Sequence, residues 1–173
     1  MNTTHHMQSI IRTCLKPFFN YFYKLKIHQT EPLPTSGPRL ILANHTSFLD
    51  VPLLSCLLDE PCLFAVNTQI AKRWWVKWSM LWAETYLIDP SSAGQMRALI
   101  HAVQSGRPLV LFPEGGITTT GSLMKLYDGA AVIADRAQAQ IILVHIDGPQ
   151  YTCFSRLSST MRHRLTHPIT LTV

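Results

Sequence analysis

The chain lacks any hydrophobic run long enough to cross a bilayer as a helix. A spanning helix needs about 20 predominantly apolar residues, and no uninterrupted apolar run here reaches about 18. Four basic residues interrupt the apolar N-terminal stretch: Arg12, Lys16, Lys24 and Lys26. Neither a spanning helix nor a cleavable signal peptide is therefore predicted, and any membrane contact is expected to be peripheral.

Cysteine is sparse, and no Cys-x-x-Cys motif is present. The four cysteines lie in apolar surroundings: Cys14, Cys56, Cys62 and Cys153. This pattern predicts reduced, mostly packed thiols in a protein of the cytosolic side, without disulfides. A serine esterase is disfavoured because no Gly-x-Ser-x-Gly elbow is present, and a cysteine esterase because no cysteine lies in a recognisable motif.

Charged residues make up only 14% of the 173 residues, and acidic residues are the scarcest, with ten against fifteen basic ones. The resulting net charge of +5 and pI near 9.2 favour anionic partners such as phospholipid headgroups, nucleic acid or an acidic carrier protein. Nucleic acid is disfavoured, because Trp and Leu rather than Gly and Arg accompany the basic residues. The 47% of hydrophobic residues is ample for the core of one domain.

Short apolar runs recur along the chain and are separated by stretches of helical length. They predict strands at Arg39 to Ala43, Cys62 to Val66, Thr85 to Ile88, Pro108 to Phe112, Ile141 to Ile146 and Ile169 to Val173. The pattern indicates an α/β sandwich with a largely buried, mostly parallel sheet flanked by helices. A proline-rich linker, Glu31 to Pro38, separates an N-terminal segment, 1–30, from the main domain, 31–173.

The N-terminal segment predicts an amphipathic helix from about Met7 to Lys26, which Pro17 should kink or divide. Such a helix either lies on a membrane or covers one side of the sheet, and the covering role is the more common one. A second segment has Trp74, Trp78 and Trp82 at intervals of four, with basic residues interleaved. It suits a bilayer interface or a tryptophan-rich core helix equally well.

The first predicted strand of the main domain runs directly into a His-x4-Asp motif, His45 to Asp50. The carboxyl end of a strand is where open α/β sheets place their sites. A carboxylate that holds one imidazole nitrogen protonated leaves the other free to take a proton from an alcohol. His45 is thus a candidate general base and Asp50 its orienting partner, with a substrate hydroxyl as the nucleophile.

Structural alternatives exist for each residue of this motif. His45 can be a hydrogen-bonded structural histidine. Asp50 can cap a helix, because Pro52 is tolerated only in a first turn. Ser47 is a candidate substrate-binding residue, and its structural alternatives are to add a local hydrogen bond or to cap the turn.

A glycine-rich loop, Pro113 to Gly121, follows another predicted strand. Gly115 and Gly116 would let backbone amides approach an oxygen-rich ligand, and threonines such as Thr118 add hydroxyls, so the loop can grip a phosphate or glycerol group. Glu114 can accept a hydrogen bond from a substrate hydroxyl. A tight connection without a ligand is the alternative, and the loop lacks the Gly-Lys-Ser/Thr ending of a nucleotide-triphosphate loop.

Taken in order, Asn44-His45-x-Ser47-x-x-Asp50 and Phe112-Pro113-Glu114-Gly115 resemble the paired signature of the glycerolipid acyltransferase superfamily, which includes lysophosphatidic acid acyltransferases. The stretch FPEGGITTTGSLMKLYDGA, residues 112–130, is similar to the acyltransferase domain of bifunctional 2-acylglycerophosphoethanolamine acyltransferase/acyl-ACP synthetases. There a large synthetase domain follows, so the chain is expected to be either a free-standing acyltransferase or a fragment.

The resemblance implies that His45 is the general base, Asp50 its partner, and Glu114 with Gly115 the acceptor-binding pair. It also implies acyl transfer from acyl-ACP or acyl-CoA to a lysophospholipid without metal, cofactor or acyl-enzyme, at the cytoplasmic face of an inner membrane. Pro90 matches the bifunctional subgroup and favours a lysophosphatidylethanolamine-like acceptor. Gly116 departs from that subgroup, which has arginine there, so a bidentate phosphate contact is missing.

The chief alternative is a catalytically weak membrane- or lipid-binding module that keeps the fold. Gly116 and the early end of the chain motivate it. The oxyanion of the acyl-transfer reaction would need N–H donors from the glycine loop or the neighbouring helix start, and the sequence does not distinguish these two. His163 and His167 have i, i+4 spacing, but two histidines among arginines are an incomplete zinc site, and no metal is predicted.

Overall fold

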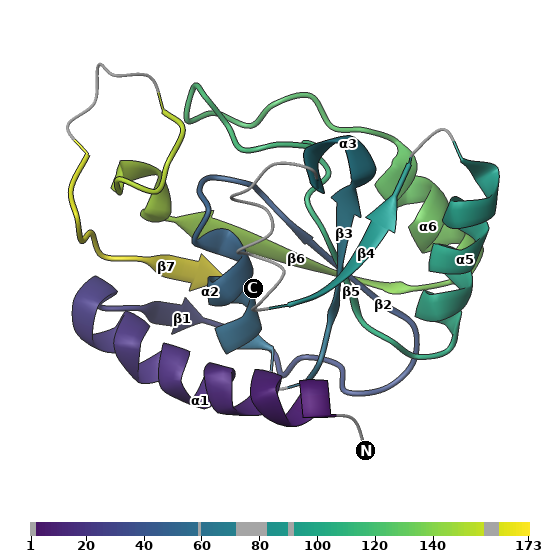
Figure 1. Cartoon of the computed structure of the whole chain (residues 1–173), viewed down its shortest axis with the longest axis horizontal. Coiled ribbons are helices and arrows are strands. Elements are labelled where there is room, and N and C mark those ends of the chain that lie inside the picture. Colours follow the sequence, from purple (N-terminus) through teal and green to yellow (C-terminus); the bar gives the residue numbers. More distant parts are fainter. Residues whose placement is uncertain (1–2, 59, 72–82, 90–91, 158–162) are drawn as a thin grey trace.

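The computed structural model describes residues 3–58, 60–71, 83–89, 92–157 and 163–173 (Figure 1). Within these residues seven strands form one sheet in the order β1-β7-β6-β2-β5-β3-β4. The strands are β1 Lys26–His28, β2 Arg39–Ala43, β3 Leu63–Asn67, β4 Glu84–Ile88, β5 Leu109–Leu111, β6 Gln140–Asp147 and β7 Thr170–Thr172. All neighbouring strands pair in parallel except β6 and β7, which confirms the predicted mostly parallel α/β class.

Helices cover both faces of the sheet and divide the core in two. They are α1 Thr3–Tyr23, α2 Asp50–Leu57, α3 Thr68–Ala71, α5 Ala93–Gln104 and α6 Gly129–Ala137, with a 3-10 turn η1 Pro149–Tyr151. On one face α1 and α2 bury the inward side chains of β6 and β7, such as Val144, Ile146 and Leu171. On the other face α5 and α6 bury Leu40 and Leu109. Figure 1 shows α5 and α6 together at one end of the molecule and α1 along β1.

The α1 helix is continuous through Pro17, so of the two predicted effects the division of the helix is wrong, and the kink stays a prediction. It also begins and ends earlier than predicted. Phe19 and Tyr23 are buried in the core, and the helix packs on α2, so this part of α1 covers one side of the sheet. Phe18 and Phe22 remain exposed, and membrane contact through α1 stays a prediction.

One face of β6 is left open, because α5 and α6 cover only the part of the sheet from β2 onward. Along β6, buried and exposed side chains alternate, and Ile142 and Val144 point into the core beneath α1 and α2. Ile141 and Leu143 point the other way and are 53% and 67% exposed. This open face, Ile141 and Leu143, is an apolar surface remote in sequence from the His-x4-Asp motif.

The structure bears on the predictions about a membrane-spanning helix, the tryptophan stripe and the cysteines in different ways. Among the described helices, none combines the length and apolarity that a bilayer span requires. The tryptophan stripe lies in 72–82, outside the described residues. None of the four cysteines forms a disulfide, but only Cys56 and Cys62 are buried, so the prediction of mostly packed cysteines is wrong for Cys14 and Cys153.

Candidate active site

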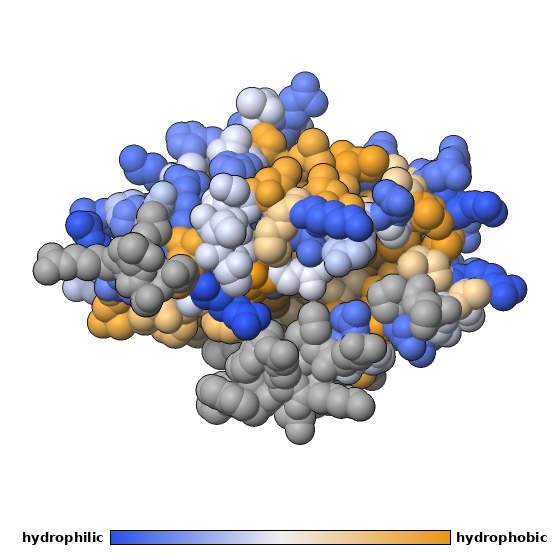
Figure 2. All heavy atoms as spheres, turned by 90° about the horizontal axis from the view of Figure 1, so that it is seen from above, coloured by the Kyte–Doolittle hydropathy of each residue, from blue (hydrophilic) through white to orange (hydrophobic). Residues whose placement is uncertain are grey.

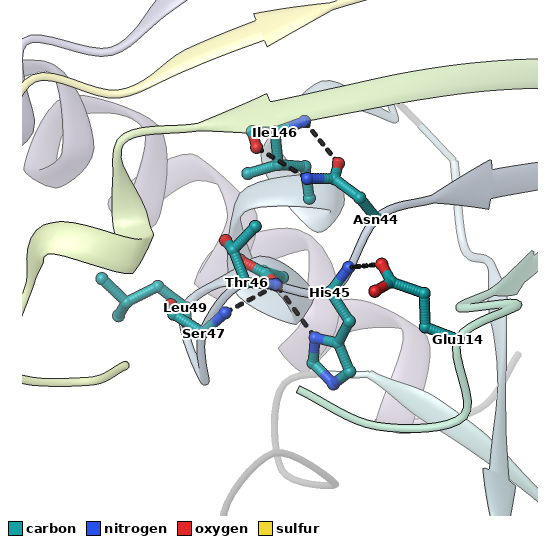
Figure 3. Close-up of polar contacts among 8 residues, drawn as sticks. Asn44, His45, Thr46, Ser47, Leu49, Glu114 and Ile146 are labelled. Atoms are coloured by element: carbon teal, nitrogen blue, oxygen red, sulfur yellow. Dashed lines mark hydrogen bonds and ion pairs between the residues drawn. The ribbon is translucent and has the colours of Figure 1, made fainter. Parts of the chain in front are cut away.

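The His-x4-Asp motif forms the connection between β2 and α2. The Nδ1 atom of His45 lies 2.9 Å from Oδ2 of Asp50. Because an ionised carboxylate can only accept, Nδ1 carries the hydrogen and Nε2 is the basic nitrogen. The structure gives Nε2 no hydrogen bond to any residue it describes, and the ring points away from the loop (Figure 3). The His45 side chain is 17% exposed, whereas Asp50 is fully buried.

Asp50 is held by the loop that precedes it. Its carboxylate accepts hydrogen bonds from the Thr46 amide at 2.5 Å, the Ser47 amide at 2.9 Å and the Thr46 hydroxyl at 3.0 Å. Asp50 is the first residue of α2 and Leu49 occupies the cap position without a side-chain cap bond. The prediction that Asp50 caps this helix is therefore wrong, because its carboxylate faces backward to the loop.

Every backbone amide from His45 to Asp50 donates a hydrogen bond within the protein. The acceptors, in order, are Glu114 Oε1, Asp50 Oδ2 twice, Phe154 O, Ser47 Oγ and Ser47 O. Ser47 is fully buried, and its Oγ accepts from the Leu49 amide at 2.9 Å, so it makes a local hydrogen bond that caps this turn. Its predicted contact with a substrate stays a prediction. The loop is thus rigidly specified, and none of these six amides is left for a substrate oxyanion.

Asn44 fastens the loop to the neighbouring strand. Its amide nitrogen donates to Ile146 O at 2.9 Å, and its Oδ1 accepts from Ile146 N at 2.7 Å (Figure 3). The side chain thereby continues the pairing between β2 and β6 by one more step after the backbone has turned away. The sequence did not predict this role of Asn44, because its partner Ile146 lies 102 positions further along the chain.

The glycine-rich loop is bonded directly to His45. Glu114 Oε1 accepts from the His45 amide at 2.9 Å, and the Thr118 amide donates to His45 O at 2.8 Å. The Phe112 ring stacks on the imidazole with centroids 4.0 Å apart and planes 15° apart, a contact that the sequence did not reveal. The two motifs therefore meet at the carboxyl edge of β2 and β5, as expected for parallel neighbours.

Glu114 and Thr118 both have roles inside the protein. Glu114 is 5% exposed, and its second oxygen accepts from the Met124 amide at 2.9 Å. The Thr118 hydroxyl donates to Ser122 O and accepts from the Gly121 amide, which closes the turn. Their predicted contacts with a substrate hydroxyl or phosphate stay predictions, beside these observed bonds.

The two adjacent glycines differ in their surroundings. Gly115 has φ +70°, and an added Cβ would lie 3.1 Å from the Tyr127 ring, so this position requires glycine. Its amide is bonded to Phe112 O. At Gly116 φ is ordinary, and a Cβ would meet no atom within 4 Å. Gly116 therefore leaves an open space beside the loop where a side chain would fit.

Other candidate chemistry is less well supported by the described residues. They contain no cluster of three or more His, Cys, Asp or Glu suited to a metal. His163 and His167 each place Nδ1 2.9 Å from a backbone carbonyl, Thr152 O and Pro168 O respectively. Burial raises the pKa of the Cys56 thiol to about 11, with Lys16 opposing this, so Cys56 is not an activated nucleophile.

Several known proteins are similar to this chain in sequence. A family model described as Acyltransferase matches residues 24–147. The chain is 25% identical over 151 residues to human 1-acyl-sn-glycerol-3-phosphate acyltransferase beta, which covers 83% of this chain and 52% of that protein. It is 26% identical over 132 residues to 1-acyl-sn-glycerol-3-phosphate acyltransferase of Saccharomyces cerevisiae, covering 69% of this chain and 44% of the yeast protein. The chain thus spans about half the length of these curated relatives.

The fold is also that of a solved structure. The 1-acyl-sn-glycerophosphate (LPA) acyltransferase PlsC from Thermotoga maritima superposes with a TM-score of 0.71 at 18% identity. The match covers 95% of this chain and 66% of that chain. At this identity the likeness establishes the shared sheet and helix arrangement.

Proposed function

Because the chain belongs to the Acyltransferase family, we propose that it moves a fatty acyl group from a thioester to the free hydroxyl of a lysophospholipid. The observation that carries the proposal is the His45–Asp50 pair, with Nδ1 bonded at 2.9 Å to a fully buried carboxylate and Nε2 left unbonded by the described residues. This arrangement is suited to a general base that acts on an alcohol.

In the proposed reaction, Nε2 of His45 removes the proton of the acceptor hydroxyl as its oxygen attacks the thioester carbonyl carbon. Asp50 stabilises the resulting imidazolium and keeps the ring oriented. Collapse of the tetrahedral intermediate breaks the carbon–sulfur bond, and the imidazolium returns its proton to the departing thiolate. The products are an ester and a thiol, and the steps require no acyl-enzyme, metal or cofactor.

Oxyanion stabilisation is proposed to come from the glycine-rich loop. The amides of residues 45–50 are all engaged, and the Gly115 amide is bonded to Phe112 O. The Gly116 amide has no acceptor among the described residues and is the remaining candidate in this part of the loop.

The acceptor is proposed to be a 1-acylglycerol phosphate or its headgroup-bearing derivative. The names of the human and yeast relatives support 1-acylglycerol 3-phosphate. Pro90, which lies outside the described residues, and the resemblance of residues 112–130 to the bifunctional enzymes favour lysophosphatidylethanolamine. The donor is proposed to be acyl-ACP or acyl-CoA, and the protein a peripheral one at the cytoplasmic face of the inner membrane.

The test is transfer of a radiolabelled acyl chain from acyl-ACP and, separately, acyl-CoA to each of the two acceptors in vesicles. His45→Ala should lower turnover by about 10³-fold, because general-base catalysis and the imidazolium are lost. His101→Ala, a change at an exposed histidine of α5, should leave turnover unaltered. If folded, vesicle-bound wild-type protein transfers nothing with any pair, the enzyme proposal fails and a lipid-binding module takes its place.

A further inference from the structure

Exposed apolar side chains are concentrated in one short loop beside the active site. In the docking loop, Leu123–Tyr127, the side chains of Leu123, Leu126 and Tyr127 are 67%, 49% and 60% exposed. Lys125 is exposed among them, with its Nζ 5.6 Å from the centre of the Tyr127 ring. These large apolar side chains are therefore only partly covered by the rest of the protein.

The docking loop is bonded to the group that holds His45. The Met124 amide donates to Glu114 Oε2, whose other oxygen accepts from the His45 amide, both at 2.9 Å. At its end, the Tyr127 amide donates to Pro113 O at 2.9 Å. The Glu114 carboxylate thus bridges the docking loop and His45. A surface that contacts the docking loop therefore lies close to the active site.

We propose that the docking loop inserts into the surface of an anionic phospholipid bilayer and holds the active site at the headgroup layer. The inference rests on the proposed function, in which the acceptor is a lipid. Leucine side chains enter the acyl region, whereas tyrosine and lysine are the residues that sit at headgroup depth and reach phosphates. The net charge of +5 adds attraction to an anionic surface.

The rim that carries this loop has a mixed surface. In Figure 1 the chain between β5 and α6 runs along the upper side of the molecule, and Figure 2 looks down on that side. There hydrophobic side chains gather in a patch between hydrophilic ones instead of being evenly scattered (Figure 2). Apolar patches rimmed by polar groups are typical of membrane or protein contact sites.

The open face of β6 supplies a matched control. Leu143 is exposed to the same fraction as Leu123, 67%, and Ile141 and Leu126 are 53% and 49% exposed. No hydrogen bond among the described residues links Ile141 or Leu143 to Glu114 or His45. If exposure alone drove adsorption to lipid, both pairs would matter equally.

The first measurement is co-sedimentation with vesicles of phosphatidylethanolamine and phosphatidylglycerol that contain neither acceptor nor thioester. Leu123→Ser with Leu126→Ser should lower the partition coefficient at least about tenfold, and Ile141→Ser with Leu143→Ser less than about twofold. Tyr127 is left intact because its ring rests on Gly115. Equal losses in both pairs, or no loss in the loop pair, would overturn the proposal.

A positional measurement protects the test against misfolding of the double variants. In a background with the exposed Cys14 and Cys153 changed to serine, a fluorophore is attached to Leu123→Cys or to Leu143→Cys. Brominated lipids should quench the loop label strongly and the sheet label weakly, whereas the reverse order would refute bilayer insertion. Neither readout depends on acyl transfer, so a failure of bilayer insertion is distinguishable from a failure of the proposed function.

Discussion

Arg39 begins strand β2 and His45 follows its C-terminal end, and the environments of these two side chains differ. At the N-terminal end, Arg39 is 4% exposed and is paired with Glu60. Its guanidinium also donates to three backbone carbonyls, those of Pro34, Gly37 and Gly106. All of its nitrogens are thereby engaged. After the C-terminal end, His45 has one nitrogen bonded to Asp50 and the other free of bonds to the described residues.

The comparison separates structural from chemical use of a charged pair. A buried cation whose donors are all satisfied fixes the loops that surround it and offers nothing to a ligand. Arg39 does this for the linker before β2, the Glu60 segment and the turn after α5. His45 is instead held by its ring, its amide and its carbonyl, and the nitrogen that remains is the one positioned for proton transfer. Breaking the Arg39–Glu60 pair should therefore lower stability, whereas breaking the His45–Asp50 pair should lower turnover.

The largest effect is expected from Asp50→Asn. The amide can still accept from the loop and keep the backbone in place, but it cannot stabilise an imidazolium, so turnover should fall by about 10³-fold or more. Glu60→Gln makes the same chemical change at the other end of β2 and should leave turnover of the folded protein within about twofold. The measurement is acyl transfer per folded molecule. Similar losses in both variants would contradict the distinction.

Arg39→Met should mainly lower the free energy of unfolding. Three carbonyls lose their donor and Glu60 loses its partner, although that carboxylate is 39% exposed and can hydrate, so the cost should be roughly 3 kcal/mol. Urea unfolding followed by circular dichroism measures it. Turnover per folded molecule should stay near that of the wild type. A variant of unchanged stability would show that Arg39 is not the structural anchor of its end of β2.

The strands were predictable because burial on both faces of a parallel sheet makes nearly continuous apolar runs. Each of the six predicted strands appears within one or two residues of its predicted bounds. The seventh, β1, was missed because it is three residues long and its outer side chains, Lys26 and His28, are exposed. It is defined by pairing with β7, at the far end of the chain.

The candidate site was predictable as a pair of motifs at strand ends, but the bonds that organise it were not. The sequence predicts Arg39 only as the first residue of a strand, and its burial depends on groups from three loops. Glu114 reads as a substrate-binding carboxylate, whereas its observed partners are the amides of His45 and Met124. Such contacts join residues far apart along the chain, and neither spacing nor composition encodes them.

The smallest effect is expected from Gly116→Arg. This change adds a guanidinium near His45, whereas the guanidinium of Arg39 lies at the other end of β2. The position has an ordinary φ and no atom within 4 Å of an added Cβ, so the side chain should be accommodated without loss of stability. A guanidinium there should lower the KM for 1-acylglycerol 3-phosphate about tenfold through a charge-assisted hydrogen bond to phosphate. The KM for an uncharged monoacylglycerol is the control and should not change. Gly116→Ala, which adds bulk without charge, should change neither value, and an equal fall in KM for both acceptors would mean that the arginine acts on the loop and not on phosphate.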